Sequence, residues 1–92
     1  MRYEWDPMKD AENRRKHGFG LEEGIYALVD PDCVSWIDRR FDYGEERILN
    51  LGRVNAGVRF VVITEVFEEI TRIISVRRAE KHEEYWYYHG RP

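Results

Sequence analysis

The sequence predicts an α+β fold, with helical patterns at the two ends of the chain and strand patterns gathered between them. Helix start and stop residues bracket an early segment, whereas β-branched and alternating apolar segments fill residues 33–77. A charged, alanine-containing segment from residue 78 is typical of a surface helix. Segregated helices and strands indicate the α+β class. We expect one domain over residues 1–92, with N-terminal helices, an antiparallel sheet of about four strands and a C-terminal helix.

The first helix is expected over residues 7–17. Asp6 is a good N-cap, Pro7 suits the first helical position, and Gly18 can adopt the left-handed conformation that ends a helix. The preceding residues 3–5, Tyr-Glu-Trp, form either a short strand or an aromatic anchor.

A second helix is expected over residues 21–29, where apolar residues recur at helical spacing. The strand segments are residues 33–37, 46–54, 58–67 and 70–77. Residues 58–67 are apolar on both faces, so we place this strand in the sheet interior. Asn55-Ala56-Gly57 predicts a turn before it, and Glu68-Glu69 a turn after it. The last helix is expected over residues 78–88, with all helices packed on one face of the sheet.

Composition excludes several classes of protein. Apolar residues make up 42% and aromatic residues 14%, which argues against global disorder. No apolar run approaches a membrane span, and the first residues do not form a signal peptide, so we expect a cytoplasmic protein. Cys33 is the only cysteine, which excludes a disulfide framework and a cysteine-based metal site.

The charge distribution allows an anion-binding site on an acidic body. The net charge is −3, which is unusual for a nucleic-acid binder. However, residues 71–92 carry five basic and three acidic groups, and 12 of the 15 basic residues are arginine. Arginine is the better bidentate ligand for phosphate.

Three charged clusters are candidates for chemistry, and each also has an ordinary explanation. The clusters are residues 14–18 with Lys16 and His17, residues 45–47 with Arg47, and Arg72, Arg77 and Arg78 with the acids and His82 that follow. Cations suit a helix C-terminus, and a Glu-Arg pair can be a surface ion pair. An arginine among apolar residues needs an anionic partner, which is either an internal acid or a ligand such as phosphate.

The sequence contains no known zinc spacing, no glycine-rich phosphate loop and no nucleophile elbow. What remains is a metal-free set of Arg, Lys, His and Glu side chains. Such a set suits RNA cleavage, because the 2′-hydroxyl attacks its own neighbouring phosphate. The protein then supplies only a base, an acid and cations.

Several motifs together resemble the BrnT toxins over nearly the whole chain. They are Glu4-Trp5-Asp6 with Lys9, Asn13, Lys16-His17-Gly18 and Glu22-Glu23, then Glu46-Arg47 before Leu51-Gly52, then Arg-Ile-Ile-Ser-Val-Arg-Arg-Ala at residues 72–79. The resemblance implies a RelE-like fold and a ribonuclease toxin that cleaves RNA without metal or other cofactor, inhibiting translation and growth.

The same resemblance implies the partners. We expect neutralisation by a BrnA-type antitoxin with a ribbon-helix-helix domain. The apolar strand faces and the Tyr- and Trp-rich end of the chain predict a heterotetramer with two copies of each chain; alternatively, Trp86 and Tyr85 cover the domain's own core. RNA is the implied substrate, and operator DNA is reached only through the antitoxin. No membrane partner is implied.

On this interpretation Arg47, Arg72 and Arg77 surround the scissile phosphate and His17 is the acid or base. Lys16 and Arg78 contact the RNA. Residues 72 and 77 lie on opposite faces of a regular strand, so both reach one phosphate only if the strand ends or bulges near Val76. The change to helical composition at Arg78 suggests such a break, and we rank Arg77 above Arg72 as the phosphate ligand.

An alternative keeps the resemblance but not the activity. The chain would then be a non-catalytic binding module that serves as partner or co-repressor of an antitoxin DNA-binding protein. Candidate acid and base residues favour the enzyme.

Overall fold

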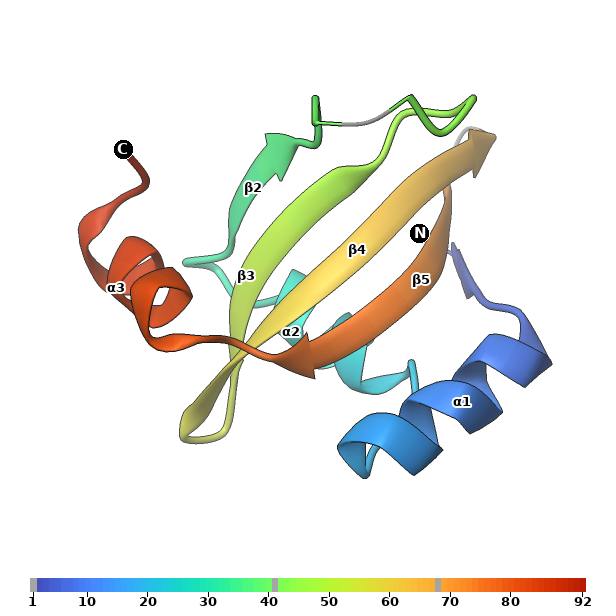
Figure 1. Ribbon diagram of the computed structural model, residues 1–92, viewed down its shortest axis with the longest axis horizontal. Coiled ribbons are helices and arrows are strands. Elements are labelled where there is room, and N and C mark those ends of the chain that lie inside the picture. Colours follow the sequence, from blue (N-terminus) through green and yellow to red (C-terminus); the bar gives the residue numbers. More distant parts are fainter. Residues whose placement is uncertain (1, 41, 68) are drawn as a thin grey trace.

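The computed structural model describes residues 2–40, 42–67 and 69–92, and its centre is a five-stranded sheet with helices on both faces (Figure 1). The strands are β1 (Arg2–Glu4), β2 (Val34–Ile37), β3 (Ile48–Val54), β4 (Gly57–Phe67) and β5 (Ile70–Arg78). The helices are α1 (Pro7–His17), α2 (Glu23–Leu28) and α3 (Lys81–His89). The strand order is β1-β5-β4-β3-β2.

The sheet confirms the interior position of β4 and corrects the strand number. β4 lies between β5 and β3, and these pairs are antiparallel as expected. The fifth strand is β1, which pairs in parallel with β5 and sets Glu4 opposite Arg72. Residues 3–5 are ambiguous in the sequence because three residues carry too little periodicity to identify a strand. Glu68, placed in a turn by the sequence, lies outside the described residues.

The helix predictions are confirmed except at the ends. α1 begins and ends as expected, with the Asp6 side chain accepting from the Met8 N–H and Gly18 left-handed at φ 83°. α2 starts at Glu23, and Leu21 is fully buried in the preceding turn. α3 starts three residues later than predicted because β5 continues to Arg78.

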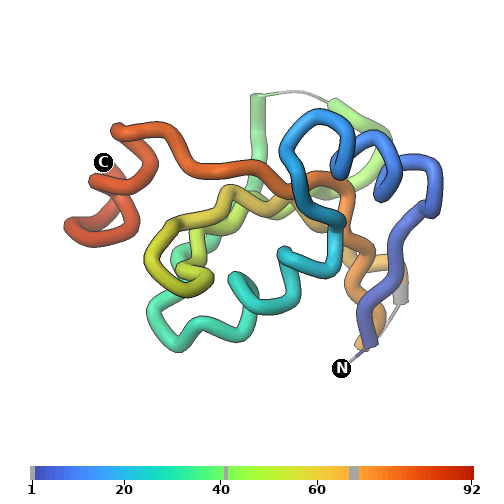
Figure 2. The backbone as a smooth tube through the Cα atoms, turned by 90° about the horizontal axis from the view of Figure 1, so that it is seen from below, coloured from blue at the N-terminus to red at the C-terminus, as the bar shows by residue number. Residues whose placement is uncertain are grey.

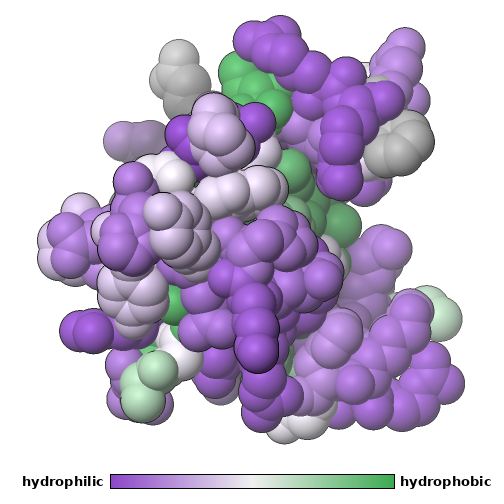
Figure 3. Space-filling model, turned by 60° about the vertical axis from the view of Figure 1, so that its left-hand side comes forward, coloured by the Kyte–Doolittle hydropathy of each residue, from purple (hydrophilic) through white to green (hydrophobic). Residues whose placement is uncertain are grey.

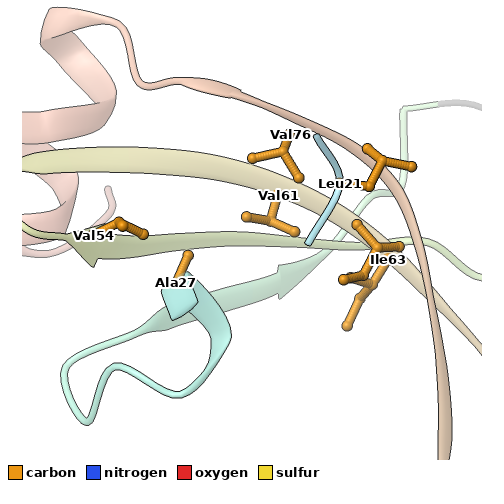
Figure 4. Packing of buried hydrophobic residues seen from close by; sticks show 7 residues of the cluster. Leu21, Ala27, Val54, Val61, Ile63 and Val76 are labelled. Atoms are coloured by element: carbon orange, nitrogen blue, oxygen red, sulfur yellow. The ribbon is translucent and has the colours of Figure 1, made fainter. Parts of the chain in front are cut away.

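The expectation that all helices pack on one face is wrong. α2 covers one face, over a core made of Leu21, Ala27, Val54, Val61, Ile63, Ile73 and Val76 (Figure 4). α3 covers part of the opposite face, where Trp86 packs against a second core of Leu49, Leu51, Val58 and Phe60. Figure 2 shows α2 and α3 on opposite sides of the sheet. β4 is apolar on both faces because each face is covered.

One glycine sets the distance between α2 and the sheet. A Cβ atom on Gly52 would lie 2.0 Å from the carbonyl oxygen of Ala27, which is backbone and cannot rotate away. The helix therefore approaches β3 as closely as a residue without a side chain permits.

Two buried polar contacts hold α3 in place. Arg77 donates two hydrogen bonds to Glu83, at 2.7 and 2.9 Å, and Glu83 also accepts from the Glu80 N–H in a capping box. Burial would raise the pKa of Glu83, but hydrogen bonds from Arg77 and the Glu80 amide outweigh it and lower the pKa below its ordinary 4.5. At the far end, the Tyr87 hydroxyl donates to Asp30 in the loop between α2 and β2.

We predict that Gly52→Ala destabilises the fold by about 3 kcal/mol or more, because the new methyl group must displace α2 from β3. Gly57→Ala is the matched control. A methyl group there would meet only the end of the Arg59 side chain, with Nη1 2.7 Å from its Cβ atom, and no backbone atom within 4 Å. Chemical denaturation measures both. Equal, small effects would show that α2 is not held against β3 in this way.

We predict that Glu83→Gln lowers the free energy of unfolding by about 1–3 kcal/mol at neutral pH, since Arg77 loses its charged partner. The folded-state pKa of Glu83 is lowered, so its stabilisation is present above pH 4.5 and is lost as pH falls through the folded-state value. The variant should therefore show a flatter decline of stability in acid. Glu84→Gln, on the exposed side of the same helix, is the control. Identical acid profiles for wild type and Glu83→Gln would contradict this role.

Candidate functional site

A cavity of about 380 Å³ lies where β1, β5 and the start of α1 meet the end of the loop before β3. We call it the arginine cavity. Its charged lining residues are Glu4, Asp6, Lys9, Glu45, Arg47 and Arg72. Ile73 and Ile74 add an apolar wall. Two predicted site residues, Arg47 and Arg72, therefore share one cavity with a third cation and three carboxylates.

Arg72 is held by β1 but remains accessible. Its Nε donates to Glu4 Oε2 at 2.8 Å, its Nη2 lies 2.7 Å from the same oxygen, and its side chain is 47% exposed. The internal acid that the sequence left as an alternative is therefore present. Because an exposed ion pair contributes little net stability, an anionic ligand can compete for this guanidinium.

Arg47 has hydrogen-bonding capacity to spare. Its guanidinium lies over the Tyr43 ring at 3.9 Å, and its Nη2 is 3.9 Å from Glu45. Its Nε is buried and has no hydrogen-bond partner among the described residues. The Arg47 side chain is 27% exposed, so an anion in the cavity can be bound by the outer guanidinium nitrogens rather than by the buried Nε.

A bulge in β5 decides where the other arginines point. Val62 pairs with Ser75 and Ile63 with Ile73, which leaves Ile74 as the extra residue. On β4, Phe60 pairs with Arg77 and Thr64 pairs with Arg72. Because paired residues point to the same side of the sheet, both arginines lie on the side that carries α3. The bulge that the sequence required thus occurs two residues before Val76.

Sharing a face does not bring Arg77 to the arginine cavity. Its guanidinium binds Glu83 and lies 4.1 Å over the Phe60 ring, in a separate cavity. The predicted grouping of Arg77 with Arg47 and Arg72 is therefore not formed. The physical reason is that the start of α3 brings its own carboxylate to Arg77.

Lys16 and His17 line a second, smaller cavity of about 170 Å³, which we call the histidine cavity. It adjoins the arginine cavity, because Lys9 and Ile74 line both. Arg78 donates to the His17 carbonyl at 3.3 Å and so joins this end of α1. Lys9 and His17 are eight positions apart on α1, or roughly 12 Å along its axis. His17 lines the histidine cavity, whereas Arg47 and Arg72 line the arginine cavity.

Asn13 fixes α1 beside these cavities. β1 covers the edge of β5 only as far as Arg72, and Asn13 accepts from the Val76 N–H at 3.2 Å further along that edge. The Asn13 amide also donates to the Phe19 carbonyl at 2.9 Å. This buried side chain replaces a missing strand partner and sets the position of Lys9 and His17.

Sequence reasoning missed Glu4 and Lys9 as site residues, and it placed Glu45 in a candidate cluster without giving it a role. Glu4 and Lys9 occur in the opening motif, which was the available signal. Their position near Arg72 depends on the parallel pairing of β1 with β5, which no local sequence pattern predicts.

Within residues 2–40, 42–67 and 69–92, no three His, Cys, Asp or Glu side chains gather in a way that could hold a metal ion. Nor is any helix in this part of the chain long and apolar enough to cross a membrane.

Comparisons with known proteins identify the family. The sequence family described as "Ribonuclease toxin, BrnT, of type II toxin-antitoxin system" matches residues 5–83. The crystal structure of the Brucella abortus ribonuclease toxin BrnT is similar in fold, with a TM-score of 0.64 and 21% sequence identity. That match covers 88% of this chain and 99% of the Brucella chain. The comparison with curated proteins gives no match. The family match spans most of the chain, and the protein therefore belongs to the BrnT family of ribonuclease toxins of type II toxin–antitoxin systems.

Proposed function

We propose that this chain is an endoribonuclease toxin whose scissile phosphate binds in the arginine cavity. The observation that carries the proposal is the convergence of Arg47, Arg72 and Lys9 on one cavity that also contains carboxylates. Three cations can stabilise the negative charge that develops on the phosphate, and a carboxylate can take a proton.

The proposed reaction is transesterification. The RNA 2′-oxygen forms a bond to the adjoining phosphorus, and the bond from phosphorus to the 5′-oxygen breaks. Glu45 is the better candidate for the base, because its ion-pair partner Arg47 is 3.9 Å away, whereas Glu4 accepts a 2.8 Å hydrogen bond from Arg72 and lies 2.7 Å from its Nη2. The leaving 5′-oxygen takes a proton from Lys9 or from water.

The remaining predicted residues are assigned to neighbouring parts of the RNA. Lys16 and His17 line the histidine cavity and Arg78 donates to the His17 carbonyl, so we propose that these three residues bind an adjacent nucleotide. His17 is then a proton donor or acceptor only for a phosphate seated in the histidine cavity. Arg77 keeps α3 in place, which ranks Arg72 above it as the phosphate ligand.

We also propose that the arginines and Lys9 supply the positive charge for catalysis without a metal ion, in the cytoplasm where translated RNA is found. A type II toxin has a protein antitoxin. The family resemblance supports a BrnA-type antitoxin with a ribbon-helix-helix domain, two copies of each chain, and contact with operator DNA through the antitoxin. Antitoxin binding without RNA cleavage or growth arrest would instead support the non-catalytic module.

We predict that Arg47→Ala and Arg72→Ala each reduce RNA cleavage roughly a hundredfold or more, since each removes about 2–4 kcal/mol of transition-state stabilisation. Arg15→Ala is the control, because Arg15 is exposed on α1 and lines neither cavity. Cleavage is measured on purified protein of verified fold, with growth arrest as the cellular readout. Full activity in both variants would remove the arginine cavity from the mechanism.

We predict a different effect for Lys16→Ala. Loss of one phosphate contact should weaken RNA binding and reduce the slope of log affinity against log salt by about 0.7. Turnover at saturating RNA should change little. A variant with the wild-type salt slope and a large loss of turnover would place Lys16 at the scissile phosphate instead.

A further inference from the structure

The α3 side of the sheet carries a second group of arginines and aromatic rings beyond the arginine cavity. Trp36, Trp86, Phe60 and His82 line a cavity of about 430 Å³, which we call the tryptophan cavity. An adjoining cavity of about 540 Å³, lined by Arg39, shares Trp36 and Arg91 with it. This side of the molecule is mainly hydrophilic, with only small separate hydrophobic areas (Figure 3).

The aromatic rings present edges and faces that a base could use. The rings of Trp36 and Trp86 are 6.0 Å apart and nearly perpendicular, and His82 lies 4.9 Å from Trp86. Arg91 covers the Trp36 ring at 4.6 Å, so a planar cation already occupies a stacking position. Both tryptophans remain partly exposed. Bases stack on such rings with little regard to sequence.

The charge of this region is positive after internal pairing. Asp38 is held by Arg40 at 2.9 and 3.1 Å, and Glu83 is held by Arg77. Arg39 and Arg91 have no acidic partner in the part of the chain that the structure describes. Two exposed guanidinium groups beside aromatic rings favour a polyanion that also has flat apolar groups, which is the chemistry of a single-stranded nucleic acid.

The region lies beside Arg47, which lines the arginine cavity. The Asp38 N–H donates to the Arg47 carbonyl at 2.9 Å, and Trp36 pairs with Leu49, two residues after Arg47. Trp36 and Arg47 are therefore diagonal neighbours on one face, with Cα atoms roughly 7–8 Å apart. A strand of RNA at Arg47 can reach Trp36 within a nucleotide or two.

We infer that the tryptophan cavity is a substrate subsite, in which a base flanking the cleaved bond stacks on Trp36 or Trp86. Arg39 and Arg91 then contact the RNA backbone. This inference rests on the proposed function, because it assumes that the scissile phosphate occupies the arginine cavity. It explains how an acidic toxin binds RNA beyond the reacting phosphate.

The test compares two non-cleavable ligands, a 2′-O-methyl RNA of about eight nucleotides and a 2′-O-methyl dinucleotide. Fluorescence anisotropy measures the affinity of each for the purified full chain. The wild type should bind the longer strand more tightly. The Arg39→Ala/Arg91→Ala double variant should lose about tenfold of that advantage. Trp36→Leu should do the same, while Trp36→Phe, which keeps a ring, should retain most of it.

The control is the Arg15→Ala/Arg53→Ala double variant, which removes the same charge from exposed positions elsewhere. An equal loss in the control would show a general charge effect and overturn the subsite. So would a wild type without length preference, or Arg39 and Arg91 variants that bind RNA normally but fail to bind the antitoxin. Failure of the proposed function is read separately, as absence of cleavage of unmodified RNA by the wild type.

Discussion

The extra residue at Ile74 in β5 is the constraint on which the rest of the site depends. In a regular strand Arg72 and Arg77 would project from opposite faces, and Arg72 would point into the core under α2. The bulge returns Arg72 to the α3 side while Ile73 and Val76 both stay in the α2-side core. Ile74 itself lies between the two cavities and lines both. One inserted residue thus lets β5 keep its apolar side chains in the core while its arginines lie on the opposite face.

The second constraint is the extent to which each arginine is paired with a carboxylate. Some are tied to a carboxylate as part of the fold, as Arg77 is to Glu83. Others are only loosely paired, as Arg47 is with Glu45 at 3.9 Å. Both kinds sit on a chain of net charge −3, so the overall charge says little about the site. What a polyanion encounters is the local distribution of unpaired donors.

Much of the fold was predictable because local signals agree with the tertiary structure. The Asp6-Pro7 start and Gly18 stop define α1, and the doubly apolar pattern of residues 58–67 marks the central strand. The sequence left residues 3–5 as a strand or an aromatic anchor, and it did not predict the parallel pairing of β1 with β5 or the opposite placement of α3, because both arise from long-range packing of short segments. The arginine pair was found from residue type. The separation of this pair from Arg77 was not predicted, because no local sequence pattern shows that Glu83 of α3 pairs with the Arg77 guanidinium.

The central claim is that RNA is cut at the arginine cavity by its own 2′-hydroxyl, with protein cations in place of a metal. The most direct measurement is the chemistry of the cut ends, made in the presence of a strong chelator. The account predicts 2′,3′-cyclic phosphate ends, continued cleavage in chelator, and no cleavage of a strand that carries a 2′-deoxy sugar at the scissile position. Cleavage of the 2′-deoxy strand, or complete loss of activity in chelator that added metal restores, would contradict it.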